Sequence, residues 1–553
     1  MVSERLRRVP GWLWMGAGVF LLLLLRSLAA GPEYWPQLDD YIQLWNYPTA
    51  ESFGALCQSV GLLASRPLAG VADYFLWGRL NGCMLIGSAL ISLLYAVTAV
   101  LLQRLVGRYF ATSPIFLVVM ALLPLGMEGT YWMSAATRVV VGLFFAALTG
   151  TAFAWWLDRG GWQRGIVYAL LQILPFGFYE QAGIFAVALV MGMAILEWLE
   201  RRPRRRRGLL ALWGLPAMVL YLQLVTVLAA MSTGVYGSRT QLRSLLDNYY
   251  WEVFLPDLLK QLYNAFIRGG LYTLFKGFLR GMQAVLSGEL LIWVLVLVLL
   301  CGLFLWISLR FGGGGEEGGR HGPLLAFVCG LLMAAAPVSL FFLLENAWFS
   351  LRNTVSSFPG AALMADAVIL GIWSRLPGRQ RGPAVLAAAM ALVFCVAGAS
   401  EVRDYRDTYE NDQKVAGLIL DTVSADQGHV GILGIEPSAL PDQNFFWHEH
   451  IHGCTESSWA LSGLLASRAG GGAPDVTPLP TDPIYERWNQ AANRPEGFDT
   501  LYWYDPAGEG ALVPVTLSQT GEHDFDVLLP DGQLLGTVWE EADGLGYFRL
   551  AQP

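Results

Sequence analysis

The sequence predicts a polytopic α-helical membrane protein of about eleven transmembrane helices with a C-terminal extracytoplasmic domain of α+β or mostly β structure. Of its 553 residues, 55% are hydrophobic and only 14% are charged, whereas soluble domains carry about 25% charged residues. The charge is also uneven, because residues 1–400 hold long apolar blocks and residues 401–553 hold a normal mixture rich in Asp and Glu. We therefore expect a transmembrane domain over 1–400 and a soluble domain over 401–553.

The first apolar block, residues 11–30, follows three arginines near the N-terminus. It could be a signal peptide, but its length, its tryptophans and the spans that follow favour a retained helix. About 20 apolar residues are needed to cross a bilayer. The remaining predicted spans are 81–103, 113–127, 138–157, 165–179, 182–198, 209–230, 289–309, 322–344, 355–374 and 383–400. The pair from 165 to 198 could instead form one long helix.

The distribution of positive charge gives these spans a direction. Short loops rich in Lys and Arg stay in the cytoplasm, and the most basic short loops are RRPRRRR (201–207) and RLPGRQR (375–381). With eleven spans, both are internal if the N-terminus is cytoplasmic. The sequence therefore predicts a multi-pass protein of the plasma or inner membrane with segments 31–80, 231–288 and 401–553 outside. The basic 231–288 segment is an exception that the rule tolerates, since long loops follow it weakly.

The two long outer segments within the membrane domain, 31–80 and 231–288, combine helical apolar spacing with many aromatic residues. This pattern is typical of helices that lie in the membrane interface. In the soluble domain we expect a helix over 401–423, a strand over 429–435, and β-hairpins after residue 511 with turns at 530–532 and 542–544.

Composition also excludes some partners. The net charge of −8 is the sum of a basic membrane part and an acidic tail, and no basic patch interleaved with aromatics is present. Nucleic acid is therefore not an expected partner. The six cysteines show no CxxC spacing, so no zinc or redox motif is indicated.

The strongest chemical signal is the acidic pair Asp39 and Asp40 in PQLDDYIQLW, shortly after the first span. Two adjacent carboxylates just outside a membrane can act on a substrate, one accepting a proton while the other orients the hydroxyl or binds a divalent cation. They can also begin a helix, where Asp is favoured as a cap. Both interpretations can hold together.

The arrangement of one span, an outer loop that opens on an acidic pair, about ten further spans and an outer C-terminal domain resembles the GT-C superfamily of glycosyltransferases. Protein O-mannosyltransferases and lipid A aminoarabinose transferases belong to it. The specific motif is Asp39-Asp40, and SRPL (65–68), which contains Arg66, is similar to a GRP-like element of bacterial members. The resemblance covers the whole architecture and identifies a class rather than a subfamily.

The resemblance implies an activity. A GT-C enzyme takes a sugar from a polyprenyl-phosphate carrier on the outer face of the membrane, and an acid of the first loop is the general base on the acceptor. Here Asp39 or Asp40 would be the base, in an inverting displacement with the lipid phosphate as leaving group. The acceptor would be a cell-envelope glycan, lipid or protein, and basic residues near the membrane would hold the carrier phosphate.

Further polar residues cluster at the predicted outer ends of the spans. Ionisable groups at this depth are functional candidates, although each alone could simply be a boundary residue. They are Glu128, Tyr131, Arg138, Glu180, Glu345 and Arg352. We assign Arg138 and Arg352 to the carrier phosphate, because arginine offers a bidentate fork to phosphate oxygens, with Lys276 and Arg280 as alternates.

Three histidines alternate in FFWHEHIHGC: His448, His450 and His452. In a strand they would share one face and could meet a metal ion, but the spacing matches no established zinc motif. We favour substrate contacts for His448 and His450 and assign no metal.

Two other classes remain open. One is a transporter or flippase of envelope precursors, which usually has charged or broken helices at mid-membrane; here Asp366 is the main such charge. The other is a non-catalytic envelope assembly protein whose tail binds a partner.

Overall fold

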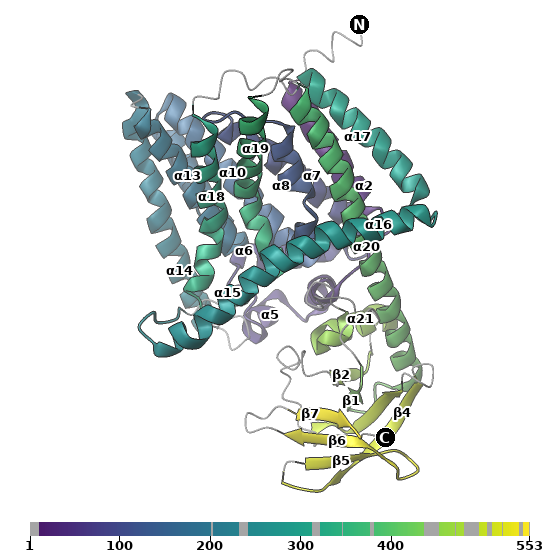
Figure 1. Ribbon diagram of the computed structural model, residues 1–553. Helices are drawn as coiled ribbons and strands as arrows, with labels where there is room; N and C mark the ends of the chain where they lie inside the picture. The colour runs from purple at the N-terminus through teal and green to yellow at the C-terminus, as the bar shows by residue number, and fades with distance from the viewer. Residues whose placement is uncertain are drawn as a thin grey trace. The chain divides into compact units, whose positions relative to one another are not determined.

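Long apolar helices make up most of the chain before residue 400. In the computed structural model, nine helices of the described residues are long and apolar enough to cross a membrane, which confirms a polytopic helical membrane protein (Figure 1). They are α7 (Met84–Val106), α8 to α9 (Pro114–Tyr131), α10 (Met133–Arg159), α13 (Glu180–Leu199), α14 with the turn before it (Arg205–Ala230), α17 (Leu291–Phe311), α18 with the turn after it (Pro323–Phe342), α19 with the turn before it (Leu351–Trp373) and α20 (Gly382–Thr422).

The structure describes residues 10–200, 203–231, 242–311, 321–345, 347–375, 381–435, 453–470, 472–479, 497–505, 511–522, 524–540 and 546–551. The chain divides into two compact units. Unit 1 contains Met1–Tyr34 and Glu51–Val402, and unit 2 contains Trp35–Ala50 and Arg403–Pro553.

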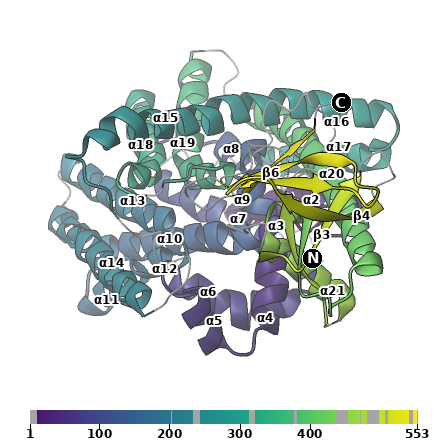
Figure 2. The same ribbon diagram turned by 90° about the horizontal axis from the view of Figure 1, so that it is seen from below.

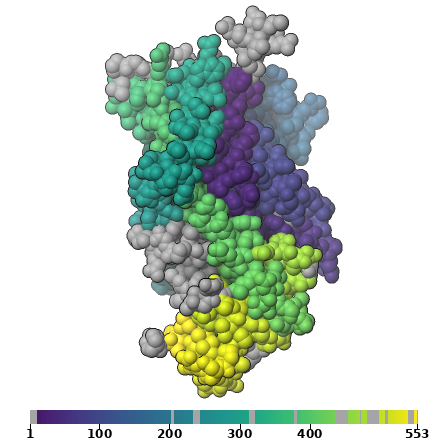
Figure 3. Space-filling view, turned by 90° about the vertical axis from the view of Figure 1, so that its right-hand side faces the viewer, coloured from purple at the N-terminus to yellow at the C-terminus, as the bar shows by residue number. Residues whose placement is uncertain are grey.

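In unit 1, the first helix, α2 (Gly11–Ser27), is shorter than the nine long spans. It packs against α7 and α17, and its atoms form the purple column in Figure 3. Val19 and Leu22 are completely buried. At Gly18 a β-carbon would lie 3.0 Å from the Phe304 ring, so a glycine allows the close helix approach that is common between membrane helices.

The predicted span 165–179 consists of two short helices, α11 (Trp162–Leu171) and α12 (Leu174–Phe178). Tyr179 is extended, with φ −156° and ψ 121°, and α13 begins at the next residue. The alternative of one long helix over 165–198 is therefore wrong.

The long segments of unit 1 that were predicted to lie outside the membrane also contain helices. After α5 (Phe53–Ser59) and α6 (Pro67–Phe75), a later run of α and π turns from Tyr250 to Leu286 includes α15 (Leu255–Tyr263) and α16 (Gly277–Leu286). Figures 1 and 2 show α15 and α16 lying across the ends of the bundle helices rather than along them. Leu259, Ile267, Leu271 and Phe275 are exposed, as expected of a helix that lies in the membrane interface.

Unit 2 contains a seven-stranded mixed sheet in the order β2-β1-β3-β4-β5-β6-β7. The strands are β1 (His429–Leu433), β2 (Asp475–Leu479), β3 (Thr500–Asp505), β4 (Ala511–Gln519), β5 (Asp524–Leu528), β6 (Leu534–Glu540) and β7 (Gly546–Leu550). β2 and β3 pair in parallel with β1, and β3 to β7 pair antiparallel. The predicted turn at 530–532 joins β5 to β6, whereas the turn at 542–544 lies outside the described residues.

The core of the sheet is built from alternate residues of successive strands, because alternate side chains share one face. Leu433, Trp503, Val515, Val527 and Phe548 form one buried cluster. The crossover between β1 and β2 contains α21 (Ser458–Ala469). A single helix, α20, contains both the predicted last span and the predicted helix 401–423, so no break separates them.

Residues 35–50 pack with the C-terminal unit, although sequence analysis placed them in the membrane domain. They form α3 (Leu38–Tyr41), a π turn and α4 (Tyr47–Thr49). Asn46 Nδ2 donates to the Trp459 carbonyl over 2.7 Å. A β-carbon at Gly463 would lie 2.6 Å from the Tyr41 carbonyl oxygen, so only glycine permits this approach of α21. Gln37 Nε2 donates to the Tyr405 carbonyl on α20 over 2.9 Å.

Candidate functional site

Three arginines of unit 1 each form an ion pair with a carboxylate that is distant in sequence. Arg352 Nε lies 2.5 Å from Glu128 Oε1, and Arg66 Nε lies 2.9 Å from Glu180 Oε2. Arg138 Nη2 lies 3.0 Å from Asp73 Oδ2. We call these six residues the arginine–carboxylate cluster. Five of them are predicted site residues, and Asp73 was not predicted.

The three pairs belong to one neighbourhood. Tyr179 interacts electrostatically with Arg66, Arg352, Glu180 and Glu128, and the Arg66 guanidinium lies 4.5 Å from the centroid of its ring. Arg66 also interacts electrostatically with Arg138. Residues from the first loop, two later connections and the 3₁₀ turn before α19 therefore converge in unit 1.

In every pair the arginine is the more exposed partner. The side chains of Arg352 and Glu128 are 24% and 1% exposed, those of Arg138 and Asp73 are 15% and 0%, and those of Arg66 and Glu180 are 23% and 16%. Two of the carboxylates, Glu128 and Asp73, are thus buried while their arginine partners remain partly exposed. The carboxylates neutralise and orient the arginines, whose accessible N–H groups can still donate hydrogen bonds to an anion.

Backbone interruptions position Glu128 and Arg352. The span α8 to α9 breaks at Leu123, where ψ is 120°, before α9 (Met127–Tyr131) carries Glu128. Arg352 lies in the 3₁₀ turn Leu351–Ser357 that precedes α19, and its backbone N–H donates to Glu128 Oε2 over 3.0 Å. A β-carbon at Gly129 would lie 3.0 Å from the Arg352 carbonyl oxygen. Glycine is therefore required for this approach of the two segments.

Hydrogen bonds hold the surrounding side chains. The Tyr221 hydroxyl donates to Glu180 Oε1 over 3.3 Å and also contacts the Ser65 carbonyl, while the Tyr179 hydroxyl contacts Asn353 Oδ1. Neither Asp73 nor Tyr221 was predicted as a site residue. The only available signal for Asp73 was a single acid among apolar residues in PLAGVADYF.

Other predicted residues have different surroundings. The Tyr131 carbonyl accepts from the Tyr34 hydroxyl over 3.2 Å, and the two rings stack with centroids 5.0 Å apart, so Tyr131 packs the core. The carbonyl of Glu345 accepts two hydrogen bonds from Arg243. Lys276 lies over the Tyr272 ring. Both Lys276 and Arg280 belong to the run that contains α15 and α16.

The two predicted catalytic acids lie in unit 2 and differ in surroundings. Asp40 is fully buried, and its Oδ2 accepts from the Gln37 backbone N–H over 3.0 Å. It is the N3 residue of a capping box in which Gln37 is the N-cap. Asp39 is partly exposed. The helix-capping interpretation therefore holds for Asp40, and Asp39 is the carboxylate that solvent reaches.

Among the residues that the structure describes, no three or more His, Cys, Asp or Glu side chains gather so that they could hold a metal ion. A divalent cation at Asp39 and Asp40 would need ligands from elsewhere, so we derive no step through one. His448 and His450 lie outside the described residues.

Comparison with known proteins does not assign the chain to a family. No protein-family model matches the chain, and no curated protein matches it in sequence.

Proposed function

We propose that this protein is a GT-C-type glycosyltransferase that moves a sugar from a polyprenyl-phosphate carrier to an acceptor of the cell envelope. The observation that carries the proposal is the arginine–carboxylate cluster, in which each of three guanidinium groups is more exposed than the acid that it pairs with. Such a face is suited to a phosphate anion next to a lipid environment. The acceptor is a glycan, lipid or protein.

In this mechanism the arginines bind the carrier phosphate and stabilise the charge that develops on it as the bond from the anomeric carbon to the phosphate oxygen breaks. The acceptor hydroxyl forms the new bond from the opposite face, so the configuration inverts. Asp39 accepts the hydroxyl proton. Asp40 holds the helix start that presents Asp39.

Arg66 is the best-placed phosphate ligand. Its contact with Glu180 uses only Nε, and within the described part of the chain no hydrogen bond from its Nη1 or Nη2 is found. Both terminal amines can therefore meet one phosphate group. This fork is what distinguishes arginine from lysine at such sites.

We expect Arg66→Ala to weaken binding of polyprenyl phosphate by about tenfold or more, because a charge-assisted hydrogen bond contributes about 1.5–3 kcal/mol. Arg79→Ala removes an exposed arginine of the same segment and is the matched control. The measurement is a titration of the wild type and both purified variants with polyprenyl phosphate, which gives the three dissociation constants. Equal affinities would remove Arg66 from the site.

The proposed orientation places the N-terminus in the cytoplasm and the sheet of unit 2 outside. If α2 and the α11–α12 pair also cross the membrane, they and the nine long helices of the described residues would make up the predicted eleven spans. Because α20 continues to Thr422, a topology reporter belongs after residue 425 and not at residue 400. A reporter that is active only in the cytoplasm should be silent there, and the same reporter after residue 205 should be active. The reverse pattern would overturn the orientation.

A transporter is the second class, and Asp366 was its main sequence signal. Asp366 is completely buried on α19 and accepts hydrogen bonds from Ser113, over 2.7 Å from the backbone N–H and 2.5 Å from Oγ. Ser113 is the N-cap of α8. Since a carboxylate is favoured at a helix N-terminus, helix capping accounts for Asp366 without a transported substrate.

A further inference from the structure

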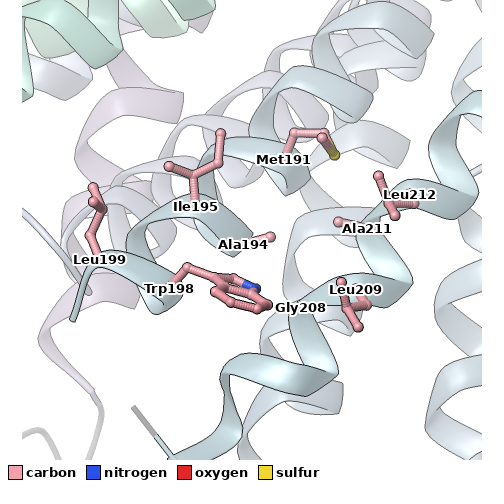
Figure 4. A pocket seen from close by; sticks show the side chains of 9 residues that line it. All are labelled: Met191, Ala194, Ile195, Trp198, Leu199, Gly208, Leu209, Ala211 and Leu212. Atoms are coloured by element: carbon pink, nitrogen blue, oxygen red, sulfur yellow. The ribbon is translucent and has the colours of Figure 1, made fainter. Parts of the chain in front are cut away.

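A groove on unit 1 lies between the C-terminal half of α13 and the turn that leads into α14, whereas Glu180 of the arginine–carboxylate cluster begins α13 at its other end. Its volume is about 400 Å³. Figure 4 shows Met191, Ile195, Trp198 and Leu199 of α13 on one side and Leu209 and Leu212 on the other. Every lining residue is apolar, glycine or alanine apart from the indole nitrogen of Trp198.

The groove is open toward the surroundings of the helix bundle. Ile195, Trp198, Leu199, Leu209 and Leu212 are all exposed large hydrophobic residues. At Gly208 a β-carbon would lie 3.4 Å from the Ala194 β-carbon and 3.6 Å from Trp198 Nε1. The absence of a side chain there therefore adds to the space between the two segments.

Exposed cations lie in the turn Pro203–Trp213 that lines one side of this apolar space. Arg205 and Arg206 are exposed, and no ion pair holds either of them within the described residues. The Arg205 guanidinium lies 5.6 Å from the centroid of the Trp198 ring that lines the groove. Arg207 is anchored instead, with Nη1 donating to the Leu157 carbonyl over 2.9 Å and its own carbonyl accepting from Trp156 Nε1 over 3.0 Å.

We propose that this groove binds one anionic phospholipid of the bilayer. An acyl chain fills the apolar space between α13 and the following turn, and the headgroup phosphate binds Arg205 and Arg206. A tryptophan beside a basic cluster at a helix end is the pattern expected at the level of the headgroups, and basic pockets between membrane helices bind anionic lipids. This site is independent of sugar transfer and of the orientation of the protein.

The test is native mass spectrometry of the purified full-length protein with added dioleoyl phosphatidylglycerol or phosphatidylcholine. We expect the wild type to prefer phosphatidylglycerol. Arg205→Ala/Arg206→Ala should lower that affinity about 25-fold, roughly fivefold per cation, and leave the phosphatidylcholine affinity unchanged. The matched control is Arg104→Ala/Arg310→Ala, which removes two exposed arginines near the ends of α7 and α17 and should change neither affinity.

A third variant tests the contribution of the apolar groove to lipid binding separately from that of the arginines. Ile195→Trp fills the apolar space and should weaken both lipids about equally. Equal binding of the two lipids by the wild type, or unchanged binding by either the arginine or the groove variant, would overturn the proposal. Preferential displacement of phosphatidylglycerol by a polyprenyl phosphate through the same arginines would also overturn it, since the occupant would then be a carrier lipid.

Discussion

Asp39→Asn should lower the rate of sugar transfer by about 10²- to 10⁴-fold, the usual contribution of a general base. Asparagine has nearly the same size but cannot accept the acceptor proton. Because Asp39 is partly exposed, the substitution should leave folding intact. The measurement is the turnover number of purified, normally inserted protein, with its thermal midpoint recorded alongside.

Asp40→Asn is the matched control for this prediction. The Asp40 carboxylate is buried and accepts a hydrogen bond from the Gln37 backbone N–H. An asparagine side-chain oxygen can keep that hydrogen bond. We expect a loss of stability of about 1 kcal/mol, typical of a capping interaction, and transfer within a few fold of wild type. If Asp39→Asn retains full transfer while Asp40→Asn loses it, the two roles are reversed; if both retain it, neither is the base.

Arg352→Ala should destabilise the protein by about 3–5 kcal/mol, the usual cost of removing one partner of a buried ion pair. The side chain left behind, Glu128, is only 1% exposed, so it would be an uncompensated charge. The thermal midpoint of the purified protein should fall clearly. Loss of transfer in this variant alone would therefore not identify Arg352 as a phosphate ligand.

The double variant Arg352→Ala/Glu128→Gln separates stability from binding. Glutamine is neutral, and its side-chain oxygen can still accept the hydrogen bond that the backbone N–H of residue 352 donates to Glu128 in the wild type. Most of the lost stability should return, while carrier affinity should stay low. Arg268→Ala, an exposed arginine of the α15–α16 run, should change stability by no more than about 0.5 kcal/mol. A single Arg352→Ala variant as stable as this control would contradict the buried pair.

Composition and periodicity predicted the membrane class because bilayer spans need long apolar stretches whatever their neighbours are. The same reasoning placed the β5–β6 turn at Pro530–Gly532. It could not separate residues 35–50 from the membrane domain. Their position in unit 2 depends on contacts such as Tyr41 with Gly463, which join segments more than 400 residues apart and leave no local pattern.

The candidate site was predictable in part for a similar reason. Glu128, Arg138, Glu180 and Arg352 are unusual because charge is costly near apolar spans, so each could be found singly. Which residues they pair with could not be predicted, since each ion pair joins separate segments of the chain. Asp73 and Arg138, for instance, are 65 residues apart in the chain. The sequence also offers no way to choose between Asp39 and Asp40 as the general base, and only the capping geometry distinguishes the two residues.

The most direct test of the central claim is the fate of the donor. Purified protein in bilayers is given a panel of polyprenyl-phosphate-linked sugars with an envelope extract as the source of acceptor, and release of free polyprenyl phosphate is measured. We predict that one donor is consumed by the wild type, that its sugar appears on an acceptor with inverted anomeric configuration, and that Asp39→Asn releases about 10²-fold less or lower still. Donors that all remain intact, or that cross the bilayer unchanged, would contradict a glycosyltransferase.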